Sequence, residues 1–217
     1  MSEFNKARKR LVESMKANKS LRSEEIENAF LALEREQFFP ERNSAHAYSD
    51  NAFAIGFSQT ISQPSTIAIM LELLQAQEGE TVLEVGSGCG YVLALLSKIV
   101  GSKGKIIGIE LVPELVKIAE DNLNKAGVEN AEVVSGDGSE GFPEKAQFNR
   151  ILISAACSEI PPALKEQLAE KGRLVAPVGD SFTQSMRVLE KRKGKIETVE
   201  EGYGFFRFVP LKGKFGF

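Results

Sequence analysis

The sequence predicts an α/β fold: a doubly wound, mostly parallel sheet, with N-terminal helices before it and a C-terminal antiparallel hairpin at its edge. From residue 81 onward, short apolar runs alternate with helical stretches, which implies parallel strands joined by right-handed crossovers. The last forty residues change to short strand-like runs around Gly194 and Gly204, as expected for an antiparallel hairpin. A length of 217 residues without internal repeats indicates a single domain, in which residues 1–78 form a helical and loop region and residues 79–217 the α/β core.

Residues 1–48 are predicted to be helical, because apolar residues recur at near-helical spacing from Phe4 to Met15. Ser23 is followed by two glutamates, which is typical of the start of a second helix. Pro40 ends this stretch. Residues 1–48 therefore form the helical part of the N-terminal region.

Residues 49–64 are rich in Gly, Ser and Asn and are predicted to be an irregular loop lying over a site. A helix follows, with Pro64 in its first turn, where proline is favoured. Its apolar residues form one stripe, which would face the core. The stripe consists of Ile67, Met70, Leu71 and Leu74.

Short strands are predicted in the core wherever a mostly apolar run lies beside a turn or a helical stretch. They cover residues 81–85, 105–109, 131–135, 150–154 and 173–178. Helices are predicted between them because apolar residues recur there at helical spacing, as Val116, Ala119 and Leu123 do. These helices cover residues 92–100, 113–126 and 162–168.

The run VLEVGSGCGY, from Val82 to Tyr91, takes a buried strand into a glycine loop and then into a helix. Glycines at positions 86, 88 and 90 let the backbone approach a ligand closely, and the helix that follows presents free N–H groups. The next strand ends in Glu110, where a carboxylate would accept hydrogen bonds from the hydroxyls of an adenosine ribose. The pattern predicts a cofactor that contains adenosine.

Two kinds of cofactor could use this loop. A dinucleotide fingerprint needs a small residue at position 91, where Tyr91 stands. Glu84, just before the first glycine, suits a ligand with an ammonium group better than one with a pyrophosphate. Both details favour S-adenosylmethionine over a nicotinamide or flavin cofactor. A glycine turn with a structural role alone is the remaining alternative.

The third strand is followed by Ser-Gly-Asp-Gly at residues 135–138. Asp137 and the neighbouring N–H groups could contact an adenine edge. The alternative is a plain turn at the end of a strand, since Asp-Gly pairs favour turns. The glycine loop and Glu110 make ligand contact the preferred interpretation.

The residues after the fourth strand suggest which group accepts the methyl. The run ILISAACSEIPP, at residues 151–162, lacks the Asn/Asp-Pro-Pro-aromatic tetrad common where base amines are methylated. His46 is the sole histidine and fits a loop residue better than a catalytic base. A hydroxyl nucleophile would need a base, whereas a carboxylate with a pKa near ~4 is already ionised. These features favour a carboxylate acceptor.

Composition limits the partners. The formal net charge of −3 does not favour nucleic acid, which usually selects a basic excess. The basic clusters at residues 6–10 and 191–195 are interpreted as solvated faces, with a binding surface as the alternative. Two cysteines outside any CxxC motif predict no metal site and a reducing, cytoplasmic location. No apolar run is long enough to span a bilayer, and a monomer is expected.

The run AIGFSQTISQP, from Ala54 to Pro64, resembles the signature loop of the protein-L-isoaspartate O-methyltransferase family. Other similar segments occur in family order over nearly the whole chain, and the resemblance implies the Rossmann-like methyltransferase fold. They are EREQFFP (34–40), AYSD (47–50), VLEVGSGCGY (82–91), GDGSEGFP (136–143), the Ala pair at 155–156, GRLVAPVG (172–179) and FRFVPL (206–211).

The resemblance implies transfer of a methyl group from S-adenosylmethionine to the α-carboxylate of L-isoaspartyl residues in damaged proteins, as a repair step that gives S-adenosylhomocysteine. A methyltransferase acting on a small molecule or RNA is the alternative, and a binding protein without catalysis is a third. Ser58, Cys89 and Asn149 depart from the commoner family residues; Ser58 puts peptide preference or rate in doubt.

The resemblance also implies site residues. Ser62 is the catalytic position, where a hydroxyl would orient the substrate carboxylate; an N-cap of the helix at Pro64 is its alternative role. The cofactor residues are Thr60, Ile61, Glu84, Gly86, Ser87, Gly88, Glu110, Leu111, Asp137 and Gly138. The substrate residues are Ser62, Ala155, Ala156 and Val209.

Overall fold

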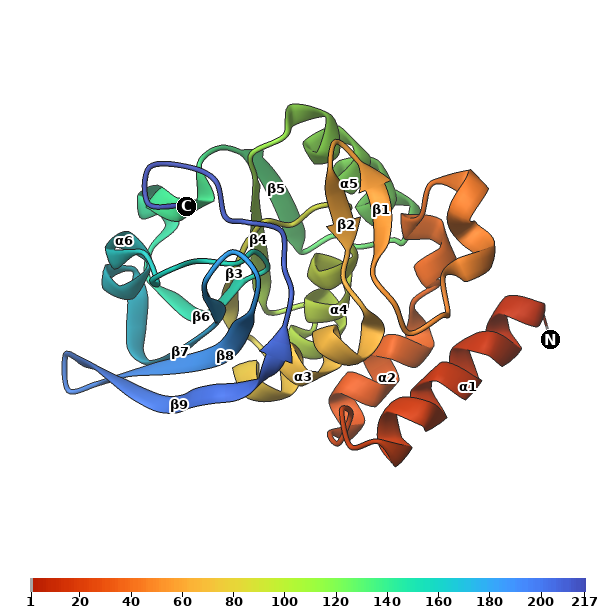
Figure 1. Ribbon diagram of the computed structural model, residues 1–217, viewed down its shortest axis with the longest axis horizontal. Helices are drawn as coiled ribbons and strands as arrows, with labels where there is room; N and C mark the ends of the chain where they lie inside the picture. Colours follow the sequence, from red (N-terminus) through yellow and green to blue (C-terminus); the bar gives the residue numbers. More distant parts are fainter. Residues whose placement is uncertain (1) are drawn as a thin grey trace.

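The structure, a computed structural model that describes residues 2–217, is built on a seven-stranded sheet with the strand order β5-β4-β3-β6-β7-β8-β9 (Figure 1). Strands β3 to β7 pair in parallel, and β8 and β9 continue the sheet as an antiparallel hairpin. The strands are β3 (Thr81–Val85), β4 (Lys105–Glu110), β5 (Ala131–Ser135), β6 (Phe148–Ile153), β7 (Leu168–Gly179), β8 (Gln184–Arg192) and β9 (Lys195–Phe206). The predicted fold class is confirmed.

The strand order reverses at β3, which lies between β4 and β6. The chain runs outward through β4 to β5 and then returns to β6 on the other side of β3. In open α/β sheets, such a reversal leaves a crevice at the carboxyl ends of the strands, where ligands bind. The glycine loop follows β3 at this end.

Helices cover the two faces of the sheet unequally. One face carries a large apolar core that joins Val82 and Leu152 to the helices from α1 to α5, whereas the opposite face packs Leu83 and Ile151 against the short α6. Successive residues of a strand point to opposite faces, so each strand supplies both cores. The helices are α1 (Glu3–Ala17), α2 (Glu24–Ala32), α3 (Pro64–Leu74), α4 (Tyr91–Val100), α5 (Pro113–Lys125) and α6 (Pro162–Glu166).

The segment predicted as an irregular loop at residues 49–64 contains a small antiparallel hairpin, β1 (Phe53–Gly56) and β2 (Gln59–Ile61). That part of the prediction is wrong. The turn places Phe57 and Ser58 in the left-handed region, with φ of 52° and 58°. Two-residue hairpin turns with positive φ usually show glycine or asparagine, and neither stands at these two positions. Ser58 therefore takes a conformation that glycine adopts more readily.

Other boundaries differ from the predicted ones. Residues 35–46 form two 3₁₀ helices, η1 (Arg35–Phe38) and η2 (Glu41–His46), rather than α-helix. Strand β7 begins at Leu168, so helix α6 is shorter than predicted. Gly194 lies at the β8–β9 turn as predicted. Two further 3₁₀ turns follow β5: η3 (Gly138–Glu140) and η4 (Pro143–Lys145).

Candidate active site

The glycine loop connects β3 to α4 through three glycines with positive φ, of 83° at Gly86, 53° at Gly88 and 83° at Gly90. A Cβ atom at Gly90 would lie 3.2–3.3 Å from atoms of Ala119, so this turn packs directly on α5. No side chain caps the first turn of α4. Its free N–H groups therefore remain available to a ligand at this end of the sheet.

Glu84 is a fully buried carboxylate on β3. Its Oε1 atom accepts a hydrogen bond of 2.6 Å from the Ser154 hydroxyl, and its buried Oε2 atom has no partner among residues 2–217. Burial raises the pKa of Glu84 to about 8, although the bond from Ser154 opposes this shift. An unpaired buried acceptor costs about 1–3 kcal/mol. A ligand ammonium group seated at Oε2 would remove that cost, so this residue fits the amino-acid tail of S-adenosylmethionine.

Glu110, at the end of β4, accepts hydrogen bonds from the glycine loop and from the segment that precedes α5. Its Oε2 atom accepts from Gly88 N at 2.9 Å, and its Oε1 atom accepts from Val112 N at 3.0 Å. Each carboxylate oxygen can accept a second hydrogen bond. Glu110 could therefore accept from two ribose hydroxyls while it keeps the glycine loop in place.

Two small cavities meet at the glycine loop, of about 40 Å³ beside Glu84 and about 150 Å³ beside Glu110. They share the lining residues Thr60, Gly86, Gly88 and Ser154, and so lie next to each other. Nearly all the residues predicted to bind the cofactor line one or both of these cavities. These are Thr60, Ile61, Glu84, Gly86, Ser87, Gly88, Glu110, Leu111 and Gly138.

Asp137 is the predicted cofactor residue that lines neither cavity. Its Oδ1 atom accepts from the N–H and hydroxyl of Ser139, at 2.9 and 2.7 Å, and its Oδ2 atom accepts from Lys214 N at 2.7 Å. Partial burial disfavours its ionised form, but the hydrogen bonds from Lys214 and Ser139 outweigh this and lower its pKa. The Asp137 side chain thus fastens the C-terminal tail, and adenine contact by it stays a prediction.

Ser62 lies between β2 and α3. The N-cap of α3 is Gln63, which makes no side-chain capping bond, so the alternative role of Ser62 as the cap is wrong. Asp50 satisfies this helix end instead, because it accepts from Ser65 N at 2.9 Å and from the Ser65 hydroxyl at 2.8 Å. The Ser62 hydroxyl therefore takes no part in capping α3.

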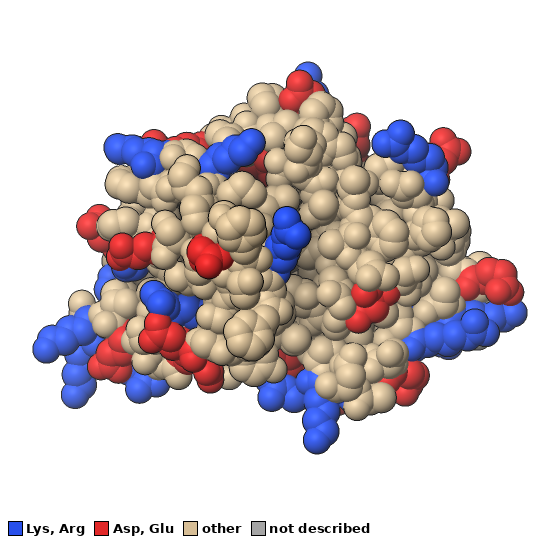
Figure 2. Space-filling model, viewed as in Figure 1, with Lys and Arg blue, Asp and Glu red and all other residues tan. Residues whose placement is uncertain are grey.

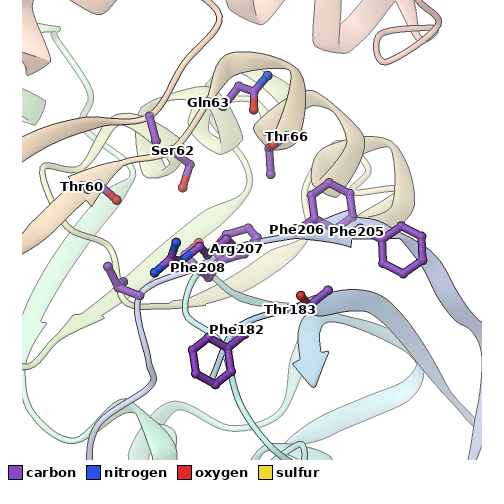
Figure 3. Close-up of a pocket in the computed structure, with 13 residues that line it drawn as sticks. Thr60, Ser62, Gln63, Thr66, Phe182, Thr183, Phe205, Phe206, Arg207 and Phe208 are labelled. Carbon is purple, nitrogen blue, oxygen red and sulfur yellow. The ribbon is translucent and has the colours of Figure 1, made fainter. Parts of the chain in front are cut away.

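A third cavity, of about 370 Å³, opens beyond Ser62. Figure 3 shows Ser62 and Thr66 above this cleft, with Phe182 and Thr183 across from them. Phe206, at the end of β9, and Arg207 and Phe208, in the C-terminal tail (residues 207–217), also lie across the cleft from Ser62. Thr60, Ser62 and Ser154 line both this cleft and the cavity beside Glu84. A substrate in the cleft would therefore meet a cofactor at these three hydroxyl-bearing residues.

Of the remaining predicted substrate residues, Ala155 and Val209 line the cavity beside Glu110, and Val209 also lines the larger cleft. Ala156 is buried and lines none of these spaces. Its backbone fastens the tail instead: Ala156 N donates to Val209 O at 2.8 Å, and Leu211 N donates to Ala156 O at 2.7 Å. The pair at 155–156 thus positions the tail that forms one wall of the cleft.

Arg35 is a supporting residue that the sequence reasoning did not single out, although it lies in the EREQFFP run. It is fully buried, and its Nη2 atom donates to Ser62 O at 2.8 Å while its Nε atom donates to Ala47 O at 2.9 Å. Its guanidinium carbon lies 4.7 Å from the centre of the Tyr91 ring. Arg35 therefore joins the segment that carries Ser62 to the first residue of α4.

The comparisons with known proteins agree with this geometry. A family model described as Protein-L-isoaspartate(D-aspartate) O-methyltransferase matches residues 5–216. Protein-L-isoaspartate O-methyltransferase 2 of Archaeoglobus fulgidus is 42% identical over 215 residues, which cover 99% of this chain and 97% of the relative. Protein-L-isoaspartate O-methyltransferase of Pyrococcus horikoshii is 42% identical over 210 residues, which cover 96% of this chain and 94% of the relative.

Solved structures show the same similarity in three dimensions. A protein-L-isoaspartate O-methyltransferase superposes with a TM-score of 0.84 at 30% identity, covering 96% of this chain and 67% of the other. A Plasmodium falciparum chain named for the same activity, solved with S-adenosyl-L-homocysteine, has a TM-score of 0.81 at 23% identity and covers 98% and 99%; at that identity it supports the fold alone. Taken with the family match over residues 5–216, these findings show that the chain belongs to the protein-L-isoaspartate (D-aspartate) O-methyltransferase family.

Proposed function

We propose that this protein transfers a methyl group from S-adenosylmethionine to the α-carboxylate of L-isoaspartyl residues in damaged proteins and peptides. The observation that carries the proposal is the meeting of two spaces at Ser62. One holds the unpaired oxygen of Glu84, and the other is an open cleft large enough for a peptide segment. The similarity to enzymes of that name across nearly the full chain supports the same substrate class.

Glu84, Glu110 and the glycine loop would each contact a different part of the cofactor. Glu84 would hold the ammonium group of the cofactor through Oε2, Glu110 would accept from its ribose hydroxyls, and the glycine loop would lie against it. S-adenosylmethionine supplies an electrophilic methyl group: the carboxylate oxygen forms the new O–C bond, the C–S bond breaks, and its electrons stay on sulfur. No base is needed, since the acceptor is already ionised.

Ser62 would then orient the acceptor. Its hydroxyl is not engaged in capping α3, and Arg35 fixes its backbone through Ser62 O. A hydroxyl that donates to one carboxylate oxygen leaves the other to face the methyl group. Alignment of this kind lowers the barrier by removing rotational freedom before the reaction.

The test uses labelled S-adenosylmethionine and two peptides of the same sequence, one with isoaspartate and one with aspartate. Base-labile label on the isoaspartyl peptide alone is the expected result. Label on neither peptide, with measurable binding of S-adenosylhomocysteine, would overturn the proposal. Label on RNA or a small molecule in its place would favour the alternative methyltransferase.

We further infer that residues 1–78 and 79–217 act as one domain in a cytoplasmic monomer that binds no nucleic acid. Met15 and Phe30 share a core with Leu93 and Val175, which supports a single folding unit. Both cysteines are free and buried, as is usual in a reducing compartment. No helix among residues 2–217 is long and apolar enough to cross a bilayer. Light scattering at working concentrations tests the monomer.

A further inference from the structure

We infer that Arg207 recognises the negative charge of the acceptor carboxylate and thereby sets the affinity of the enzyme for its substrate. The inference rests on the proposed function and adds a residue that pairs with the substrate. Arg207 lines the cleft beyond Ser62, and Figure 3 shows it on the tail, across the cavity from Thr60 and Ser62.

The backbone of the tail is fixed directly after Arg207. Phe208 N donates to Gln184 Oε1 at 2.8 Å, and the Gln184 amide donates to Asp180 O at 2.6 Å. One residue further on, Val209 O accepts from Ala156 N at 2.8 Å. Gln184 is almost fully buried. Arg207 therefore lines the cleft next to a hydrogen-bonded stretch of backbone, which reduces the entropy lost when it binds an anion.

The one charge in the lining of the cleft favours an anionic occupant. Arg207 is exposed and forms no ion pair with any acidic group of residues 2–217. No Asp or Glu lines the cleft, and Arg207 is the only basic residue that does. On the face shown in Figure 2, most charged groups lie toward the edges, and a few of both signs lie nearer the centre. The cleft thus presents one unpaired positive charge to whatever enters it.

A guanidinium matches a carboxylate in shape as well as in charge, since two parallel N–H groups can donate to its two oxygens. Ser62, on the other wall, offers one more donor. Methyl transfer turns the carboxylate into a neutral ester, so the attraction to Arg207 weakens once the product has formed. Arg207 would therefore favour substrate over product in the same cleft.

This role predicts an effect on binding rather than on the chemical step. The negative charge of the acceptor is partly lost in the transition state, so Arg207 stabilises the bound substrate at least as well as the transition state. Arg207→Gln should raise the KM for an isoaspartyl peptide by ~10-fold or more, with kcat within about three-fold of the wild-type value. Arg207→Lys should retain part of the affinity, because it keeps the charge but loses the bidentate geometry.

The decisive experiment compares two peptides of one sequence, with isoaspartate or with isoasparagine, whose amide carries no charge. Dissociation constants are measured for wild type, for Arg207→Gln and for Arg10→Gln, each saturated with S-adenosylhomocysteine. Arg10 is a matched control, because it is an exposed arginine on α1 that lines no cleft. Wild type and the control should prefer the isoaspartyl peptide ~10-fold or more, and Arg207→Gln should bind both peptides about equally.

An unchanged preference in Arg207→Gln would overturn the inference, and so would an equal loss in the Arg10 control. Binding of S-adenosylhomocysteine should be the same in all variants, since Arg207 lines neither cofactor cavity; a loss there would also count against the assignment. If the wild type methylates the isoaspartyl peptide but Arg207→Gln still binds that peptide more tightly than the isoasparagine peptide, the inference about Arg207 is refuted and the proposed function is not. Wild type that labels neither peptide refutes the proposed function as well.

Discussion

Replacing Glu84 by glutamine should remove a pH dependence from cofactor binding. Burial raises the pKa of Glu84 to about 8, so at pH 6 to 7 the carboxyl group of the cofactor-free protein is mostly protonated. An ammonium group pairs with the ionised form alone, and binding must therefore release a proton. The affinity for the cofactor reaches its maximum above pH 8 and falls by about ten-fold, or ~1.4 kcal/mol, for each pH unit below it.

The assay is isothermal titration with S-adenosylhomocysteine between pH 6 and 7.5. For the wild type, the Kd should fall by about 25-fold over this range, and buffers with different ionisation enthalpies should report nearly one proton released at pH 6. Glu84→Gln should give a flat and weaker affinity, since a neutral amide cannot titrate. A wild-type Kd that stays constant, with no proton released, would refute the reasoning.

The same shift has the opposite sign for the stability of the cofactor-free protein. The folded pKa lies above the ordinary carboxyl value of 4.5, so the unfolded chain binds fewer protons than the folded one between these values. The contribution of Glu84 to the free energy of unfolding is therefore greatest below pH 4.5. It falls as the pH rises to 8, by up to about 5 kcal/mol. In urea unfolding, Glu84→Gln should be more stable than wild type at pH 8 and similar at pH 4.5. Equal stability at both pH values would contradict this.

Three further substitutions test the site. Ser62→Ala should lower kcat and leave both the Tm and cofactor affinity unchanged, because Asp50 bonds the first turn of α3; a matching loss of cofactor affinity in titration would contradict this. Glu110→Gln should weaken S-adenosylhomocysteine binding by ~1–3 kcal/mol, since it disturbs both the ribose acceptor and the bond from Gly88 N; an unchanged Kd would exclude that role. Asp50→Ala should lower the free energy of unfolding in urea by about 1–2 kcal/mol, and no change would show that Ser65 N finds another acceptor.

Local sequence patterns predicted the parts of the fold that are decided locally. The strand before the glycine loop is apolar enough to be buried on both faces, and four of its five residues, from Val82 to Val85, are buried. The glycines at 86, 88 and 90 do adopt positive φ. The hairpin at residues 53–61 was missed because Phe57 and Ser58 carry no turn signal. Their left-handed conformation is imposed by β1–β2 pairing, and strand pairing outweighs local preference there.

Contacts between distant residues account for what the sequence did not predict at the site. Arg35 lies 27 positions before Ser62, and an arginine is ordinarily expected at the surface. Asp137 precedes Lys214 by 77 positions, so no local pattern could show that Lys214 N donates a hydrogen bond to the Oδ2 atom of Asp137. Arg207 belongs to the FRFVPL run at residues 206–211, but its place in the cleft depends on the hydrogen bonds that Gln184 and Ala156 make with the residues after it.

Tyr91 connects the two halves of the site. Its size argues against a dinucleotide-binding loop, which needs a small residue at this position. In the structure, the Arg35 guanidinium lies over the face of the same ring. A fully buried arginine without a carboxylate partner is costly, and burial lowers the pKa of Arg35. The aromatic face offsets part of that cost. Because Arg35 also holds Ser62 O, a smaller residue at position 91 would loosen the segment that carries Ser62. The residue that distinguishes the cofactor loop from a dinucleotide fingerprint thus also supports the wall of the cleft where the acceptor must be aligned.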